Sequence, residues 1–202
     1  MRIIGVTGPS GAGKGAVSEY MKTEYGFKVI DADKVYHDII SAPSDCVREL
    51  TENFGKYVLN ENGGIDRKAL SKLVFGEENK DKLLILNKIT HKYVTYEINK
   101  LLEEYANSRA EACIIDAPLL LEAGIDEICD FVIAVIADKD LRAKRIAERD
   151  GIDVESALLR INSQKSDSFY RDNSDWMLSN NLCLKELGSS VDTILRCEGL
   201  IH

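Results

Sequence analysis

The sequence lacks long hydrophobic runs and has no excess of positive charge. No segment approaches the roughly 18 consecutive apolar residues of a membrane-spanning helix, and the first residues enter directly into a strand and a loop, without a secretion signal. The formal net charge is −8 at pH 7, so the dense lysine and arginine of a general nucleic-acid binder are missing. We therefore expect neither a membrane nor a nucleic acid as a partner.

Paired cysteines are missing as well. The five cysteines are odd in number, widely spaced and without a C-x-x-C pair: Cys46, Cys113, Cys129, Cys183 and Cys197. This spacing excludes a disulfide framework and a zinc site, and most of these residues are expected in the core. A reducing cytoplasm is the expected compartment. Because repeats, low-complexity tracts and linkers are also absent, we expect one α/β domain with an insertion.

The stretch Gly8-Pro-Ser-Gly-Ala-Gly-Lys-Gly15 lies between an apolar run and a helix-compatible segment. Strand, glycine-rich loop and helix in this order predict a phosphate-binding loop, whose N–H groups and helix N-terminus attract an anion. The expected nucleotide-binding residues are Gly8, Ser10, Gly11, Ala12, Gly13, Lys14, Gly15 and Ala16. Lys14 would reach the β- and γ-phosphates of a nucleoside triphosphate.

One feature of such loops is missing. The Ser or Thr that usually follows the lysine, and whose hydroxyl helps to hold Mg²⁺, is replaced by Gly15, and Ala16 offers no hydroxyl either. Nucleotide binding is expected to survive this loss, while catalysis could be weakened.

Two acids follow the next apolar run, Phe27–Ile30. If the strand continues through Asp31 to Asp33, both carboxylates project from one face at the strand's C-terminal end, where open α/β sheets bind ligands. The alternative is a helix cap at Asp33. We favour a functional pair, because a cap explains only one of the two acids.

A third acid, Asp116, ends the apolar run Ala112–Ile115. An acid at a strand end near a phosphate loop can hold Mg²⁺ directly or through water, so Asp116 is a candidate metal ligand, with a turn acid as the alternative. Apolar runs at 131–136 and 176–179 complete five strands. The fold class expected is α/β, a three-layer P-loop fold with a mostly parallel five-stranded sheet.

The helix expected over 138–150 carries Arg142, Arg145 and Arg149 on one face. A solvated basic face is the ordinary explanation, whereas phosphate binding by the guanidinium groups is the functional one. The polar helical segment 151–174 is expected to be a movable lid.

Residues 44–109 contain no buried-strand pattern and are expected to form a helical insertion, with Asp66 capping the helix that begins near Arg67. The core then comprises 1–43, 110–150 and 175–202. His91 lies on a helical pattern in this insertion. A lone histidine is usually structural, with contact to a ligand as the alternative.

Together these features resemble the dephospho-coenzyme A kinase family, whose members transfer the γ-phosphate of ATP to the ribose 3′-hydroxyl of dephospho-CoA. The matching stretches run in the same order over nearly the whole chain: Val6–Lys14, Val29–Asp33, Ile65–Leu70, Val74–Gly76, Asp116–Glu122, Arg145, Arg149–Gly151, Arg160–Gln164 and Ser174–Asn181.

The resemblance implies roles for individual residues. Asp33 would be the base for the 3′-hydroxyl, Lys14 would hold ATP phosphates, and Arg145 would stabilise the transferring phosphoryl group. The acceptor would be bound by residues that include Asp31, Asp33, Arg67, His91 and Asp116. ATP with Mg²⁺ and dephospho-CoA are thus the implied ligands of a cytoplasmic monomer or small homo-oligomer.

Three departures from the family pattern stand out: Gly15, the lysine at position 92 where proline is usual, and the aromatic pair Phe169-Tyr170 in the lid. Two alternatives therefore stay open. One is a nucleoside monophosphate kinase acting on CMP or AMP, whose loops also have glycine after the lysine. The other is a catalytically weakened nucleotide-binding homologue.

Overall fold

The computed structural model describes residues 1–181 and 184–202. The chain divides into two compact units, one comprising residues 1–30 and 105–202 and the other comprising residues 31–104. Each unit contains a buried hydrophobic cluster of its own.

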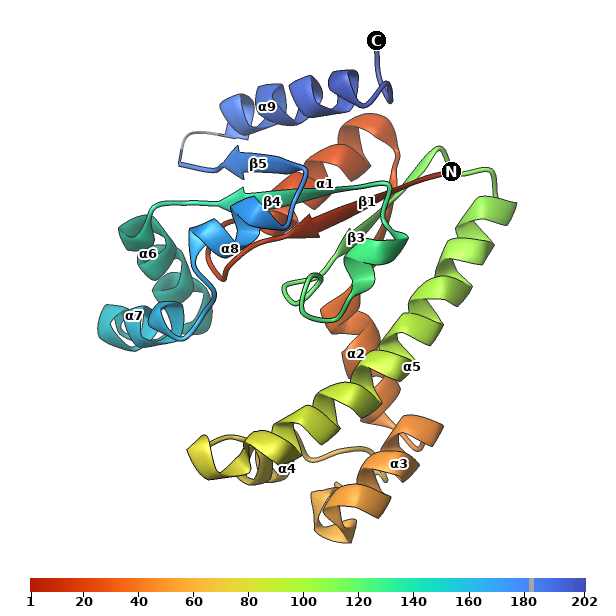
Figure 1. Ribbon diagram of the computed structural model, residues 1–202, viewed down its shortest axis with the longest axis vertical. Coiled ribbons are helices and arrows are strands. Elements are labelled where there is room, and N and C mark those ends of the chain that lie inside the picture. The colour runs from red at the N-terminus through yellow and green to blue at the C-terminus, as the bar shows by residue number, and fades with distance from the viewer. Residues whose placement is uncertain (182–183) are drawn as a thin grey trace. The chain divides into compact units, whose positions relative to one another are not determined.

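The first unit is built on a five-stranded sheet with the order β2-β3-β1-β4-β5 (Figure 1). The strands are β1 (Arg2–Thr7), β2 (Lys28–Asp31), β3 (Ala112–Asp116), β4 (Phe131–Ile136) and β5 (Trp176–Ser179). The pairs β1 with β3, β1 with β4 and β4 with β5 are parallel. The α/β fold with a mostly parallel five-stranded sheet is therefore confirmed.

Helices cover both faces of this sheet. Ile4 and Val6 of β1 are fully buried in a cluster with apolar side chains of α1 (Lys14–Tyr25) and α9 (Leu184–Cys197). Gly5 between them points the other way, where an added Cβ would lie 3.1 Å from Leu120. That face also carries η3 (Ile125–Ile128) and α8 (Asp167–Asp172). The alternation of side chains along β1 thus produces three layers.

Two aspartates fix the register of the central strands. Asp130 immediately precedes β4, and its Oδ2 accepts a hydrogen bond from Ile3 N at 2.6 Å. Asp175 immediately precedes β5 and accepts from Val132 N at 2.8 Å. Each carboxylate thus satisfies a main-chain donor at the start of the neighbouring strand.

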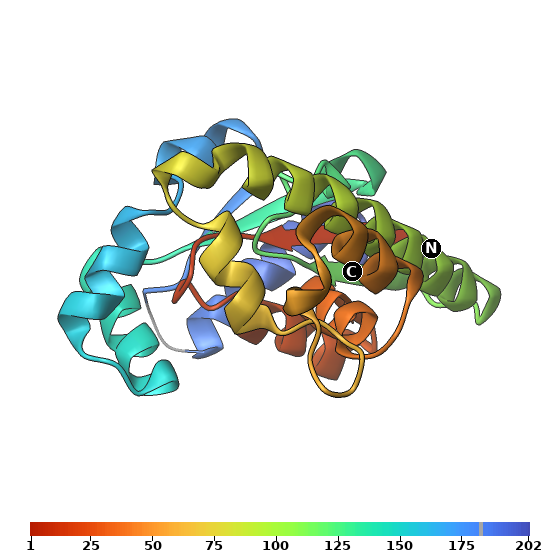
Figure 2. The ribbon, with the colours of Figure 1, turned by 90° about the horizontal axis from the view of Figure 1, so that it is seen from below.

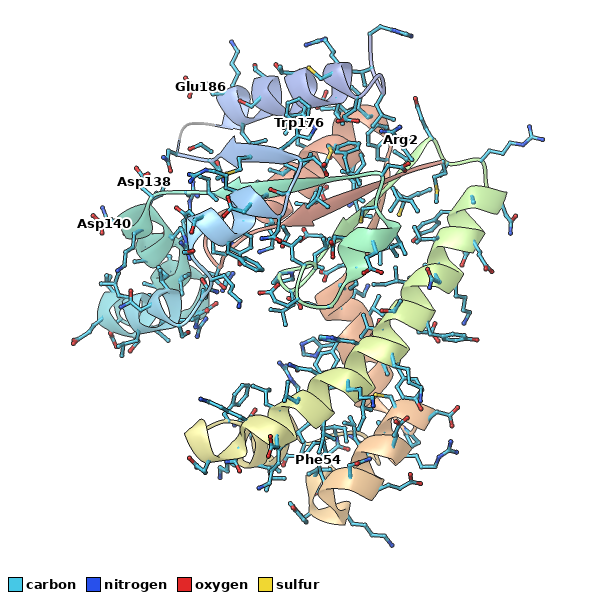
Figure 3. All side chains as sticks on the ribbon, viewed as in Figure 1. Arg2, Phe54, Asp138, Asp140, Trp176 and Glu186 are labelled. Atoms are coloured by element: carbon cyan, nitrogen blue, oxygen red, sulfur yellow. The ribbon has the colours of Figure 1, made fainter. Side chains whose placement is uncertain are left out.

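The remaining helices of this unit are α6 (Lys139–Asp150) and α7 (Val154–Asn162), which lie side by side in Figures 1 and 2. Figure 3 labels Asp138 and Asp140 at the start of α6. The contact between α6 and α7 is apolar, with Ile146 of α6 and Ile161 of α7 in one cluster. At the far end of α6, Asp150 pairs with both Arg149 and Arg160, so a carboxylate joins the two helices.

The second unit is helical, as predicted for most of this region. It contains α2 (Ala32–Ser41), α3 (Asp45–Phe54), η1 (Lys56–Val58), α4 (Arg67–Val74), η2 (Glu77–Asn79) and most of α5 (Lys80–Asn107). Asp66 caps α4, accepting from Lys68 N and Ala69 N, as expected. Leu50 is fully buried in its cluster, and Phe54, labelled in Figure 3, is nearly so.

The strand geometry expected for Asp31 and Asp33 is wrong. β2 ends at Asp31, and α2 begins at Ala32, so the two carboxylates do not project from one strand face. Asp31, not Asp33, is the helix cap, since its Oδ1 accepts from Lys34 N at 3.0 Å. The cap bond requires the extended backbone at Asp31 and a helical turn right after it.

Among the described residues, no helix combines the length and the apolar character needed to cross a membrane.

Candidate functional site

Residues 8–15 join β1 to α1 in a tight loop. Gly8, Gly11 and Gly13 have positive φ angles of 137°, 77° and 97°, a region that side chains disfavour. A Cβ on Gly11 would also lie 2.7 Å from the carbonyl oxygen of Arg142. Glycine is therefore required there by both the backbone conformation and the space available.

The carbonyl oxygens of five successive loop residues all accept hydrogen bonds. The donors are Lys14 Nζ for Gly8, Ala12 N for Pro9, Arg142 Nε for Ser10, Arg145 Nη1 for Gly11 and Asn180 Nδ2 for Ala12, at 2.8–3.3 Å. For the N–H groups of Gly11 and Gly13, residues 1–181 and 184–202 provide no bonded acceptor. Satisfied carbonyls and available amides are the arrangement of an anion-binding nest.

Positive charge surrounds this nest. Lys14 and Arg145 are half-buried, Arg142 is 5% exposed, and the first turn of α1 contains no acid. The partial positive charge of the helix N-terminus adds to these groups. An acidic protein thus carries local cationic side chains where an anion would bind.

The arginine stripe of α6 divides into different roles. Arg142 and Arg145 bond to the loop, and Arg145 Nη2 also donates to Asn180 O at 3.1 Å. Arg149 bonds instead to its neighbour Asp150. The hydrogen bonds from Arg149 and Arg160 together lower the pKa of the Asp150 carboxyl to about 2. The sequence spacing correctly placed the three arginines on one helix, but it could not show which of them bond to the loop and which bonds to Asp150.

Asp116 ends β3 beside the end of β1 and accepts a hydrogen bond from Ser18 Oγ at 2.8 Å. Ser18 lies on α1, one turn after Lys14, and is nearly fully buried. Within the described part of the chain, no group of three or more His, Cys, Asp or Glu side chains could hold a metal ion. A metal at Asp116 would thus need ligands from the nucleotide or water, as Mg²⁺ commonly does.

In the second unit, the residues predicted to bind the phosphate-accepting substrate lie on three helices. Asp33 is in the first turn of α2, Arg67 begins α4, and His91 is on α5. Arg67 Nη1 lies 3.5 Å from His37 Nδ1, a contact between α4 and α2. The sequence offered no signal for His37.

The unusual lysine at position 92 joins α5 to α3. Lys92 Nζ lies 2.8 Å from Glu49 Oε2, to which the hydroxyl of Tyr93 also donates. These two hydrogen bonds lower the pKa of the Glu49 carboxyl. The departure from the family pattern therefore has a structural partner.

Three residues around the loop had not been singled out from the sequence: Gln164, Asn180 and Ser18. Gln164 and Asn180 fall inside stretches that resemble the family, which was the only signal available for them. Their bonds to the loop join residues more than 150 positions apart, so no local pattern could reveal them.

Comparison with known proteins identifies the family. The family model described as dephospho-CoA kinase matches residues 2–186. A dephospho-CoA kinase from Fusobacterium nucleatum is 42% identical over 190 residues, which cover 94% of this chain and 95% of the relative.

Solved structures agree. A crystal structure of a Thermus thermophilus protein has a TM-score of 0.79 and 28% identity, and a dephospho-CoA kinase from Campylobacter jejuni has a TM-score of 0.60 and 26% identity. Both alignments cover 96% of each chain. The chain belongs to the dephospho-CoA kinase family of phosphotransferases.

Proposed function

We propose that this chain transfers the γ-phosphate of ATP to the ribose 3′-hydroxyl of dephospho-CoA and so forms coenzyme A. The observation that supports it most strongly is the loop of residues 8–15, in which five successive carbonyls are bonded while N–H groups of two glycines have no bonded acceptor among the described residues. Family membership supports the choice of acceptor.

In this proposal the loop amides and Lys14 bind the triphosphate of ATP, and Arg145 stabilises charge on the transferring phosphoryl group. Phosphoryl transfer depends mainly on positioning and on neutralising charge, which these groups provide. Asp33 accepts a hydrogen bond from the attacking hydroxyl and takes its proton as the bond to phosphorus forms. Arg67, His91 and Asp31 contribute to binding of the acceptor.

The residues present fit a nucleotide-bound Mg²⁺, because Asp116 would supply one carboxylate while phosphate and water oxygens would supply the other ligands. When bound, the ion would neutralise phosphate charge. Ser18 holds the Asp116 carboxylate in place. Residues 151–174 act as the lid.

We also infer a reducing cytoplasm as the compartment, because the four cysteines in the described residues are free thiols. A monomer or small homo-oligomer without nucleic-acid or membrane partners completes the proposal.

The decisive experiment is a coupled ADP-release assay that compares dephospho-CoA with CMP and AMP, with an acceptor-free reaction to subtract ATP hydrolysis. ADP release that depends on dephospho-CoA is expected. Turnover with CMP or AMP alone would indicate a monophosphate kinase. ATP binding without turnover on any acceptor would indicate a nucleotide-binding homologue.

A further inference from the structure

Gln164 bonds to the tip of the phosphate loop from the segment between α7 and α8. Its Oε1 accepts from Ser10 N at 3.2 Å and from Arg142 Nη2 at 2.8 Å. Both neighbours are N–H donors, so the oxygen of the amide must face them and its nitrogen must point away. One side-chain oxygen therefore joins the loop, α6 and the predicted lid segment.

Arg142 completes the arrangement from the other side. Its Nε donates to Ser10 O at 2.9 Å, so both main-chain polar groups of Ser10 are bonded by this pair of side chains. The backbone of Arg142 also packs directly against Gly11. Hydrogen bonds to Ser10 and backbone packing against Gly11 thus hold the loop tip at two successive residues.

Arg142 is an unusual residue to find at this depth. It is 5% exposed, and within residues 1–181 and 184–202 no carboxylate forms an ion pair with it. Burial lowers the pKa of its guanidinium group. Burying a guanidinium without a paired acid is costly, and its bonded partners are a loop carbonyl and Gln164.

We propose that Arg142 and Gln164 are a positioning pair that holds the tip of the phosphate loop in its anion-binding conformation. The loop of residues 8–15 contains four glycines, so it loses much conformational freedom when it orders around a phosphate. The pair orders Ser10 and Gly11 before the nucleotide binds, so the free energy of binding is not reduced by the entropic cost of ordering them. This inference rests on the proposed binding of ATP at residues 8–15 and adds residues that touch the loop rather than the substrate.

Substitutions of Arg142 and Gln164 can separate the effect of hydrogen-bond geometry from the effect of charge. Gln164→Leu keeps the size of the side chain and removes the acceptor, whereas Gln164→Glu keeps an acceptor oxygen at the same position. Arg142→Lys retains the charge but cannot reproduce the forked bonds to Ser10 and Gln164. Lys144→Gln is the matched control, because it removes an exposed positive charge from α6 without touching the loop.

Affinity for a non-hydrolysable ATP analogue is measured by calorimetry, amide exchange at Ser10 by nuclear magnetic resonance, and folding by thermal melting. We expect Gln164→Leu and Arg142→Lys to raise the dissociation constant about tenfold and to speed exchange at Ser10. Gln164→Glu retains the acceptor and should keep exchange at Ser10 close to the wild-type rate, and Lys144→Gln should be unchanged. In steady-state assays, the KM for ATP should rise in Gln164→Leu while that for dephospho-CoA does not.

A folded Gln164→Leu protein with wild-type affinity and unchanged Ser10 exchange would overturn the pairing. Exchange at Ser10 that is as fast in Gln164→Glu as in Gln164→Leu would overturn it as well. If the wild type binds the analogue but phosphorylates no dephospho-CoA, the proposed acceptor is wrong while the affinity comparison still tests the pair. If the wild type does not bind the analogue, the proposed nucleotide site fails, and with it the positioning role.

Discussion

At the scale of single residues, Asp31 and Asp33 combine a helix cap and a proposed catalytic base in one short segment. Asp31 caps α2 by accepting a hydrogen bond from Lys34 N, and Asp33 lies in the first turn of the same helix. Negative charge in a first helical turn is favourable, so Asp33 suits the helix as well as the proposed chemistry. Loss of the Asp31 carboxylate is therefore expected to remove a helix cap, whereas loss of the Asp33 carboxylate is expected to remove the proposed base.

We predict that Asp33→Asn lowers turnover with dephospho-CoA by about 100- to 1,000-fold, because the amide cannot accept the proton of the attacking hydroxyl. Affinity for an ATP analogue should change less than about twofold. Initial rates and calorimetry measure the two effects. Asp38→Asn, an exposed substitution on the same helix, is the control; equal turnover in Asp33→Asn and wild type would refute the role of the base.

Gly15 is a second residue with a measurable consequence. A Cβ at this position would meet nothing within 4 Å, and its backbone is not in the left-handed region. We predict that Gly15→Ser lowers the Mg²⁺ concentration needed for half-maximal activity several-fold, because it restores the missing hydroxyl.

Gly15→Ala separates this effect from helix stabilisation, since alanine provides the gain in helix propensity, up to about 1 kcal/mol, without the hydroxyl. The Mg²⁺ titration curves of the serine and alanine variants should differ. Superimposable curves would show that the hydroxyl contributes nothing.

At the scale of elements, the sequence predicted the five strands and most helices because their signals are local. Buried parallel strands are continuous apolar runs, and α4 and α7 begin with aspartate caps. The boundary between β2 and α2 was missed because a period-two pattern and a cap compete within three residues.

The candidate site could be predicted only as far as its local motif. Residues 8–15 were expected from sequence order, whereas the contacts of Gln164 and Asn180 with them depend on the tertiary fold. The division between Arg145, which bonds the loop, and Arg149, which bonds Asp150, depends on the same packing.

The junction of α6 and α7 leads to a pH prediction. Bonds from Arg149 and Arg160 lower the pKa of Asp150 to about 2, below the ordinary value of about 3.9. A carboxylate with a lowered folded-state pKa stabilises the fold fully above its unfolded pKa, and this contribution is lost as the pH falls toward the folded one.

Asp150→Asn should therefore lower the urea midpoint at pH 6, and the gap from wild type should close between about pH 4 and about pH 2. Urea titrations at several pH values measure this gap. Asp172→Asn, which changes an exposed acid on α8 outside this ion pair, is the control. A gap for Asp150→Asn that is constant with pH would contradict the ion-pair explanation.

At the scale of the whole molecule, separate hydrophobic clusters support the two units. Ile133 belongs to the sheet cluster and Leu50 to the helical cluster, and both are fully buried. Truncating either side chain to alanine removes packing worth about 2–5 kcal/mol. Because the clusters are distinct, the damage should remain mostly within one unit.

We predict that Leu50→Ala raises amide exchange in the helices of residues 31–104 and leaves β1, β3 and β4 close to their wild-type rates. Ile133→Ala is the reciprocal control and should raise exchange in the sheet. Hydrogen exchange with mass spectrometry resolves both regions. A uniform increase over the whole chain in Leu50→Ala would instead indicate a single cooperative unit.

The pairing of β1 also has a consequence for synthesis on the ribosome. Arg2 pairs with Ala112 and Ile4 pairs with Phe131, so the strand that precedes the phosphate loop emerges long before either neighbour. At about 5–20 residues per second, the delay is on the order of ten seconds. During that interval residues 2–7 are an unpaired apolar segment. The strand that leads into the proposed nucleotide site is thus made first but can be paired only after β3 and β4 have been made.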